Sequence, residues 1–509
     1  MNERAAPGLP QGQVSARLPR NVVSPLLRRD PEDRAPFVPT GSDGRSAVLV
    51  ELDLRGPQAL SIVAELFMAL FRGVHPKLPE PRRVADVYMR CALTTGEVQA
   101  LVEADRAQPA ERRSIYRAWP DYHVVSHLDQ SVATVKADAA LRTFAAAGGG
   151  ISWAVVDSGI DGGAGHFTAC RSLQDEVAGL HRDFTLAVSA DSSDPAASIA
   201  SAQQDGYGHG SHVAGIIAGR LDPAVAATAV IGQYEIGLDG LPAPTRRVLP
   251  PGATLSGVAP LAKLVSLRVF GDDGRSSTSS TLLEALHYLR TEVNGDRQEL
   301  RVQGVNLSLG HPYNPSEYGC GQSPLCREVD RLVASGVVVV VSAGNNGNAA
   351  DITGSNPDRS FGTSASITDP ANAYGALTVG SVHRSRPHTY GVTYTSSHGP
   401  TVDGRVKPDL VAPGERITSV AAGARRQALT LIPGCTIDGA ATYVEDSGTS
   451  MAAPHVSGAV AAFLSVHREY IGRPEEVRRL FCANATDLGR DPYFQGAGLV
   501  DLLRTLSAV

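Results

Sequence analysis

The 509-residue sequence lacks long apolar runs and lacks a surplus of positive charge. No stretch reaches the ~18 consecutive apolar residues that a membrane-spanning helix needs, so we expect no membrane partner. Its 46 Lys and Arg residues are outnumbered by 52 Asp and Glu residues. Because nucleic-acid-binding proteins carry basic patches, this balance predicts no nucleic-acid partner.

Cysteine is also scarce, with six residues and no CxxC pair, which disfavours a zinc ribbon or a thioredoxin-like site. Cys320 and Cys326 are close enough in sequence to close a short disulfide loop, although two reduced thiols fit the sequence equally well. The first forty residues contain no apolar segment of the secretory type. We therefore expect a cytoplasmic protein, with secretion by a non-standard route as the alternative.

The first part of the chain divides into an arm and a small domain. Residues 1–45 are rich in Pro and Arg without periodicity, which predicts a disordered arm. In residues 46–130, Thr94 and Glu97 have the spacing of a helix capping box. The elements expected there are strands at 47–54 and 85–93, helices at 61–74 and 94–108, and two strand-like runs within 114–128. This order predicts a small ferredoxin-like α+β domain.

Residues 131–509 alternate near-continuous apolar strands with helical segments, which predicts an α/β fold with a parallel sheet flanked by helices. Strands are expected at 151–157, 262–270, 304–309, 336–343 and 376–382, and helices at 209–219, 280–292 and 450–468. The segments 185–205, 220–255 and 421–445 resemble loop-like insertions.

Three residues fall at element ends on one side of the predicted sheet. Asp157 ends a strand, His209 begins a helix, and Ser450 begins a helix after Gly448. Taken singly, they could be a turn aspartate, a capping histidine and an N-cap serine. Taken together, they supply a nucleophile, a base and a carboxylate that orients the base, as an acyl-transfer triad requires.

Two further side chains bear on this chemistry. Asn345 follows an apolar strand, and its amide could donate to an oxyanion together with the Ser450 backbone N–H. Its neighbour Asn346 is the alternative donor. His209 and His212 lie three residues apart on one helical face, but no third metal ligand has matching spacing, so metal binding stays unassigned.

The motifs that hold these residues resemble those of the subtilisin-like serine proteases (subtilases, peptidase family S8). VVDSGID, GHGSHVAGIIAG and GTSMAAPHVSG resemble the family's Asp, His and Ser motifs, and VNLSLG, SAGNNG and KPDLVAPG occur in the family's order. The resemblance covers residues 133–505. It implies a serine endopeptidase that cleaves polypeptide substrates through an acyl-enzyme and needs no cofactor for the chemistry.

The resemblance also assigns roles. Asp157 would orient the base, His209 would act as general base and then acid, Ser450 as nucleophile, and Asn345 as oxyanion donor. The implied substrate-binding residues are Ser308, Leu309 and Gly310, which pair with substrate backbone, and Ser342, Ala343 and Gly344, which form the opposite wall of the pocket for the residue before the cleaved bond. The family's calcium-binding loop is not recognisable after the His helix, so a structural calcium is left open.

The domain at 46–130 resembles the inhibitor-type prodomains of this family. This resemblance implies a zymogen whose N-terminal domain is an intramolecular inhibitor, cut by the enzyme itself between residues 116 and 134. The alternative is a retained regulatory domain on a protease that processes a single target. A non-catalytic binding protein is disfavoured because the triad is complete, and an esterase because GTSMA differs from G-x-S-x-G.

Overall fold

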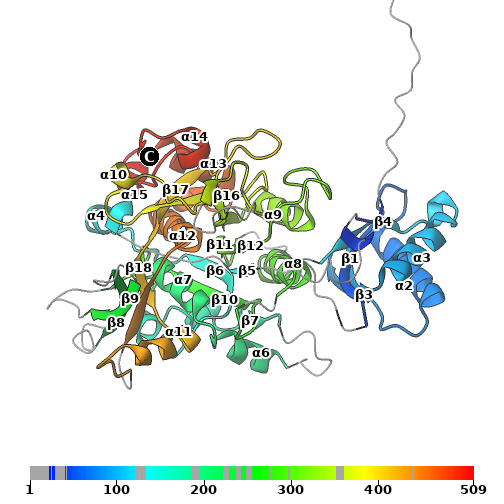
Figure 1. Cartoon of the computed structure of the whole chain (residues 1–509), viewed down its shortest axis with the longest axis horizontal. Coiled ribbons are helices and arrows are strands. Elements are labelled where there is room, and N and C mark those ends of the chain that lie inside the picture. Colours follow the sequence, from blue (N-terminus) through cyan, green and yellow to red (C-terminus); the bar gives the residue numbers. More distant parts are fainter. Residues whose placement is uncertain are drawn as a thin grey trace, which may run out of the picture. The chain divides into compact units, whose positions relative to one another are not determined.

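The computed structural model describes residues 22–24, 26–28, 41, 43–121, 125–126, 133–185, 194–221, 229–236, 242–247, 255–274, 277–295, 299–350, 360–437 and 441–509. These residues form two compact units (Figure 1). The smaller unit is built mainly from residues up to Pro120, and the larger from Asp121 onward.

The smaller unit is a four-stranded sheet in the order β2-β3-β1-β4, carrying two helices. Its elements are β1 (Ser46–Leu52), α2 (Leu60–Val74), β2 (Arg82–Ala85), β3 (Tyr88–Leu93), α3 (Thr95–Arg106) and β4 (Ile115–Pro120). Strand β1 pairs antiparallel with both of its neighbours. This arrangement confirms the small α+β domain. The strand predicted at 85–93 is wrong in detail, because a two-residue turn divides the region into β2 and β3.

The predicted capping box begins α3. The Glu97 backbone N–H donates to Thr94 Oγ1 at 3.2 Å, and the Thr94 N–H donates to the Glu97 carboxylate at 2.8 Å. Two of the N–H groups that a helix start leaves unpaired are thereby satisfied.

Part of the stretch predicted as a disordered arm is ordered. Val23 and Leu27 are buried in the core of the smaller unit, and Leu27 lies in a 3-10 turn (Leu26–Arg28). The backbone pairs with β4, since the Ala118 N–H donates to Val22 O and the Ser24 N–H to Ala118 O. Two apolar side chains suffice to dock a segment whose composition is otherwise that of a linker. Residues 1–21, 25, 29–40 and 42 of the predicted arm lie outside the described residues.

The larger unit contains a seven-stranded parallel sheet in the order β17-β16-β13-β11-β6-β10-β7, which confirms the α/β fold. Its strands are β6 (Ser152–Asp157), β7 (Arg182–Asp183), β10 (Lys263–Arg268), β11 (Gly304–Leu307), β13 (Val338–Ser342), β16 (Leu377–His383) and β17 (Leu410–Glu415). The five predicted strands are all present. The two edge strands were missed, because β7 has only two residues and β17 contains a Pro-Gly pair that usually indicates a turn.

Helices cover this sheet, and three of them lie where the sequence placed them: α7 (His209–Ile217), α8 (Ser279–Tyr288) and α12 (Thr449–Val466). The remaining helices are α4 (Ala137–Phe144), α5 (Gly165–Thr168), α6 (Pro195–Ala202), α9 (Pro324–Ala334), α10 (Pro387–Tyr390), α11 (Gly423–Ala428), α13 (Pro474–Ala483), α14 (Pro492–Gln495) and α15 (Leu502–Leu506). Helix α12 is long and apolar enough to cross a membrane by composition. It is instead mostly buried, packed against β11, β13, β16 and β17 in the middle of the unit (Figure 1).

The segments predicted as loop-like insertions contain regular structure. Helix α6 lies in the first, strands β8 (Val230–Ile236) and β9 (Pro242–Arg247) in the second, and α11 with the start of β19 (Thr442–Asp446) in the third. Together with β18 (Ile417–Val420), these strands form a second sheet in the order β18-β19-β8-β9. The loop prediction was wrong because these elements are short and some of them pair with segments far away in the sequence, as β8 does with β19.

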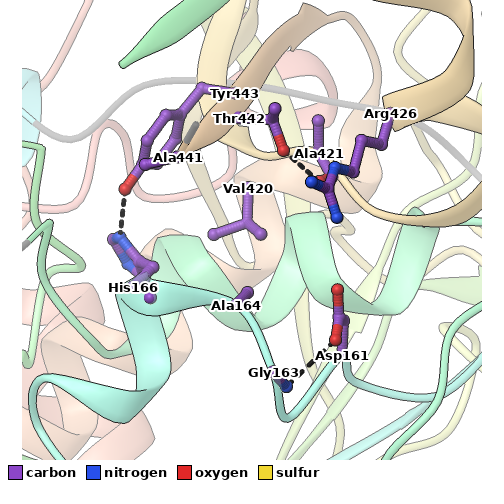
Figure 2. Close-up of a pocket in the computed structure, with 11 residues that line it drawn as sticks. Asp161, Gly163, Ala164, His166, Val420, Ala421, Arg426, Ala441, Thr442 and Tyr443 are labelled. Carbon is purple, nitrogen blue, oxygen red and sulfur yellow. Dashed lines mark hydrogen bonds between the residues drawn. The ribbon is translucent and has the colours of Figure 1, made fainter. Parts of the chain in front are cut away.

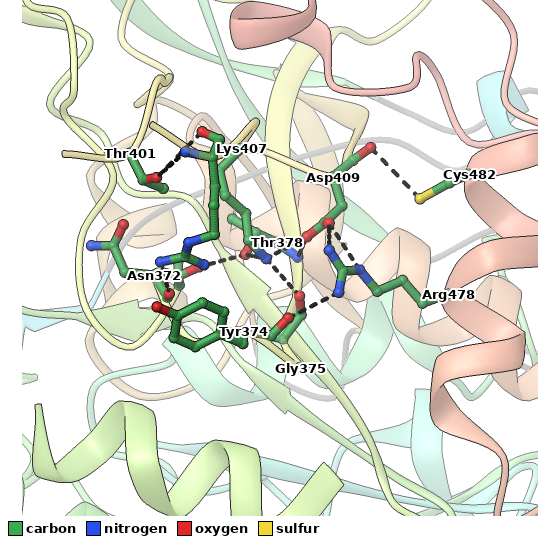
Figure 3. A network of polar contacts seen from close by, with 12 residues as sticks. Asn372, Tyr374, Gly375, Thr378, Thr401, Lys407, Asp409, Arg478 and Cys482 are labelled. Atoms are coloured by element: carbon green, nitrogen blue, oxygen red, sulfur yellow. Dashed lines mark hydrogen bonds and ion pairs between the residues drawn. The ribbon is translucent and has the colours of Figure 1, made fainter. Parts of the chain in front are cut away.

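The KPDLVAPG motif anchors the edge of the main sheet (Figure 3). The ammonium of the buried Lys407 donates to Ala376 O at 2.7 Å, Thr378 Oγ1 at 2.9 Å and Asp409 Oδ2 at 2.6 Å. The other Asp409 oxygen accepts from Arg478 of α13. A buried charge is tolerated only when it is paired and hydrogen-bonded, and this network satisfies both conditions.

Candidate active site

The structure brings Asp157 and His209 together. Strand β6 ends at Asp157 and α7 begins at His209, with His209 Nδ1 2.7 Å from Asp157 Oδ1. Both side chains are buried, with at most 1% of either exposed. An Nδ1–H that donates to the carboxylate fixes the tautomer and leaves Nε2 to exchange a proton.

A second buried carboxylate, which the sequence analysis missed, holds the two loops in place. Asp205 accepts from the Gly208 N–H at 2.6 Å, the Ser158 hydroxyl at 2.8 Å and the Ser211 N–H at 2.8 Å. Burial raises the pKa of Asp205, while these donors favour its charged form. Asp205 thereby ties the residue after Asp157 to the start of α7. An aspartate before GYGHG looks like a solvated turn residue, so no local signal identifies it.

Ser450 is held by a hydrogen bond that a proline makes necessary. Pro454 lies inside α12 and has no N–H, so the Ser450 carbonyl four residues earlier has no helical donor. The Ser308 hydroxyl donates to this carbonyl at 2.6 Å, and Ser450 Oγ is 3.3 Å from Ser308 O. The candidate nucleophile is therefore fixed against the first predicted substrate-binding residue.

Asn345 lies beside the start of the same helix. Its Oδ1 accepts from the Thr449 backbone N–H at 2.9 Å and from the Thr449 hydroxyl at 3.2 Å. Because the carbonyl end of the amide is held, the Nδ2 end is the one that can donate. Asn346 is exposed and instead gives its backbone N–H to Ser397 Oγ. Thr449 was not singled out in the sequence, although it stands next to Ser450.

The two predicted substrate-binding walls converge on Thr368. A Cβ added at Gly310 would lie 2.9 Å from Thr368 Oγ1, and one added at Gly344 would lie 2.8 Å from the same atom. Gly344 also has a φ of 107°, which favours glycine. Ser342 and Ala343 are buried at the end of β13, and the Ala343 carbonyl accepts from the Thr368 N–H.

A strand from the N-terminal side of the larger unit pairs with one of these walls. Strand β5 (Val125–Ser126) is antiparallel to β12 (Leu309–Gly310), with Ser126 opposite Leu309 and Val125 opposite Gly310. This backbone can therefore accept an added strand, which is how many proteins hold extended peptides.

His212 and the cysteines have packing roles in this structure. His212 Nε2 donates to Val444 O at 3.0 Å, and burial lowers its pKa well below the usual value. In the described part of the chain, no three His, Cys, Asp or Glu side chains gather as metal ligands. All six cysteines are free thiols, including the buried Cys320 and Cys326.

A cavity of about 360 Å³ lies between residues 161–166 and the segments that hold Val420, Arg426 and Tyr443 (Figure 2). Asp161, His166, Arg426 and Tyr443 line it, and the Tyr443 hydroxyl donates to His166 Nδ1 at 3.0 Å. Burial lowers the pKa of His166 to about 4, so this histidine is neutral at pH 7. Asp157, His209 and Ser450 are not among the residues that line this cavity.

Comparison with known proteins agrees with this geometry. The sequence model of the Subtilase family matches residues 148–498, more than half of the chain. The chain is 31% identical over 343 residues to pyrolysin of Pyrococcus furiosus, covering 59% of this chain and 21% of that protein. It is 29% identical over 309 residues to serine protease AprX of Bacillus subtilis, covering 58% of this chain and 57% of AprX.

Subtilisin E of Bacillus subtilis is 29% identical over 299 residues, covering 59% of this chain and 56% of that protein. The chain thus spans between about a fifth and somewhat more than half of these relatives. The range matched by the family model includes Asp157, His209, Asn345 and Ser450. The chain belongs to the subtilase family.

Proposed function

We propose that the protein is a serine endopeptidase that cleaves polypeptides through an acyl-enzyme. The observation that carries this proposal is the buried 2.7 Å contact between Asp157 and His209, together with the fixed start of α12 at Ser450. The chain's own side chains supply every group that the chemistry needs, so catalysis requires no cofactor.

In the first half-reaction, Ser450 Oγ attacks the substrate carbonyl carbon while His209 Nε2 takes the hydroxyl proton. The carbonyl oxygen becomes an oxyanion, which accepts from Asn345 Nδ2 and from the Ser450 N–H. The C–N bond then breaks, and His209 returns the proton to the leaving amine. Asp157 stays ionised throughout and stabilises the imidazolium.

In the second half-reaction, water attacks the acyl ester. His209 takes a proton from the water, the C–O bond to Ser450 breaks, and the proton passes to Ser450 Oγ. A carboxylic acid product leaves and the free serine is regenerated. The substrate backbone before the cleaved bond would pair with β12 as an added strand.

Covalent labelling tests this function. A fluorophosphonate probe should modify Ser450 in the mature enzyme, as located by peptide mapping. Ser450→Ala and His209→Ala should remain unlabelled, because the first lacks the nucleophile and the second lacks the base. Labelling at another serine, or equal labelling of His209→Ala, would contradict the proposal.

We further propose that the enzyme processes its own N-terminal region, with the N-terminal unit as an intramolecular inhibitor. The pairing of β5 with β12 supports this, because β5 takes the place of a substrate strand. Asp121 adds a second attachment, since its carboxylate accepts from the Ser280 N–H at 2.6 Å and from the Ser280 hydroxyl at 2.5 Å. These contacts lie at the start of α8.

The direction of β5 narrows the range of residues in which we expect the self-cleavage. Because the strands are antiparallel, the chain advances from opposite Gly310 to opposite Leu309, toward Ser308 and the nucleophile. The cleaved bond is therefore expected after Ser126, in the later part of the 116–134 window. The residues immediately after Ser126 lie outside the described residues. A retained regulatory domain is the competing proposal, and it predicts no cut.

A further inference from the structure

One of the segments predicted as a loop-like insertion lies against the catalytic histidine loop. The Ala424 N–H of α11 donates to Gly206 O at 2.8 Å. A Cβ added at Gly208 would lie 2.2 Å from Ala422 O and 3.2 Å from Arg425 Cβ. The backbone that leads into His209 is therefore confined by the insertion and has no room for a side chain at Gly208.

Arg425 of this helix contacts the elements on both sides of the catalytic group. Its Nη2 is 2.7 Å from Asp446 Oδ2, and its Cζ is 5.7 Å from the centre of the Tyr207 ring. The Tyr207 ring is in turn 6.4 Å from the His209 ring. Asp446 ends β19, four residues before Ser450. One side chain thus connects the loop that precedes the base with the strand that precedes the nucleophile.

The Arg425–Asp446 ion pair is largely shielded from solvent, so water screens its charges less than those of a surface pair. Only 12% of the Arg425 side chain and 29% of the Asp446 side chain are exposed. The Arg425 charge also acts on the carboxylates of Asp157 and Asp205. Among the described residues, the charged and titratable groups on the elements around His209 include Asp157 from β6, Asp205 and Tyr207 from the preceding loop, His212 from α7 and Arg425 from α11. Asp446 from β19 joins this group through its contact with Arg425.

We propose that Arg425 is a positioning residue for the reaction, acting through its ion pair with Asp446. This inference rests on the proposed peptidase function. The pair holds the His209 loop and the Ser450 strand at one separation, so that the base and the nucleophile meet in a reactive geometry. Such placement is valuable because a misplacement of about 1 Å can slow a reaction ~100-fold.

Steady-state kinetics on a peptide substrate test the inference, with active sites counted by fluorophosphonate titration. Arg425→Ala and Asp446→Asn should each lower kcat about 10-fold and leave KM within about 2-fold, because only transition-state alignment is lost. The double variant should lose no more than either single variant, since both remove one interaction. Arg425→Lys should recover part of the loss because it keeps the charge.

The matched control is Arg426→Ala. Arg426 is next on the same helix, lines the cavity of Figure 2 and donates to Ile437 O, so its loss should leave kcat unchanged. The pH dependence of kcat distinguishes a role of the Asp446 charge from a purely structural contact, which would lower kcat equally at every pH. Burial raises the pKa of Asp446 to about 7, so its carboxylate is largely ionised only above that pH. Asp446→Asn should therefore lower kcat most at pH 8 and progressively less as the pH falls below 7.

Several results would overturn the inference. A raised KM at unchanged kcat would make the pair a substrate contact, and additive losses in the double variant would separate the two residues. A loss of kcat in Asp446→Asn that is equal at pH 6 and pH 8 would show that the Asp446 charge plays no part. Should Arg425→Ala not fold, the near-isosteric Asp446→Asn decides the question. A wild type that does not label at Ser450 would instead refute the peptidase function on which the inference rests.

Discussion

The contribution of the Ser308–Ser450 hydrogen bond to stability can be tested by two substitutions. One removes the donor, Ser308, and the other replaces Pro454, whose missing N–H leaves the Ser450 carbonyl without a helical donor. Ser308→Ala removes the donor that replaces the missing Pro454 N–H. It also removes the acceptor of the Asn306 side-chain amide, which is 2.8 Å from Ser308 Oγ. A buried polar group left without a partner costs about 1–3 kcal/mol, so we expect a loss of about 2–6 kcal/mol for the two groups.

A second substitution should restore one of these partners. Pro454→Ala supplies an N–H that can donate to the Ser450 carbonyl within α12. In the Pro454→Ala background, Ser308→Ala should therefore destabilise less, with a coupling of about 1–2 kcal/mol between the two sites. The amide of Asn306 remains unpaired in both backgrounds, so the rescue is partial.

Unfolding in urea would be measured for all variants with Ser450→Ala present, which keeps the Ser450 carbonyl and prevents self-digestion. Ser457→Ala is the matched control, because Ser457 donates to Asn306 Oδ1 at 2.9 Å and does not reach the Ser450 carbonyl. It should show no coupling to Pro454→Ala. An equal loss for Ser308→Ala with and without Pro454 would refute this account of the helix start.

Two further predictions follow from single residues. Asn345→Ala should lower kcat by ~10²–10³, the size that loss of this donor causes in a subtilisin, and steady-state kinetics that show an unchanged kcat would remove its oxyanion role. Burial lowers the pKa of His166 to about 4, below the ~6.5 of an exposed histidine, so the unfolded state gains a proton first as the pH falls. The contribution of neutral His166 to the free energy of unfolding should therefore be fully present above pH ~6.5. It should fall by up to about 3 kcal/mol as the pH is lowered toward 4. Urea unfolding at pH 7 and pH 5 should show a smaller loss of unfolding free energy between these pH values for His166→Phe than for the wild type. An equal loss in both proteins would contradict this role of His166.

Part of the candidate site could be predicted from the sequence because local rules place its residues. Asp157 follows an apolar strand and His209 begins a helix, and the structure brings their side chains to 2.7 Å from one another. The topology of a parallel sheet predicts Ser450 at the same edge. Elements of the small domain could also be predicted from the sequence. The Thr94–Glu97 spacing, for example, locates the start of α3.

What the sequence could not show depends on contacts between distant segments. Nothing near Pro454 in the chain indicates that Ser308, 142 positions from Ser450, supplies the missing hydrogen bond. Strand β8 pairs with β19, which lies far away in the sequence, and β9 contains two prolines and pairs with β8. Arg425 is one of many arginines in the sequence, and only the fold sets it beside Asp446.

The central claim is that Ser450, activated by His209 and Asp157, cleaves peptide bonds, beginning with the chain's own. Intact mass spectrometry of purified wild type beside Ser450→Ala tests it most directly. We predict that the wild type loses an N-terminal fragment that ends between Ser126 and Thr134, whereas Ser450→Ala keeps its full mass. Two proteins of full length would contradict self-processing, and the same cut in both would show that another protease makes it.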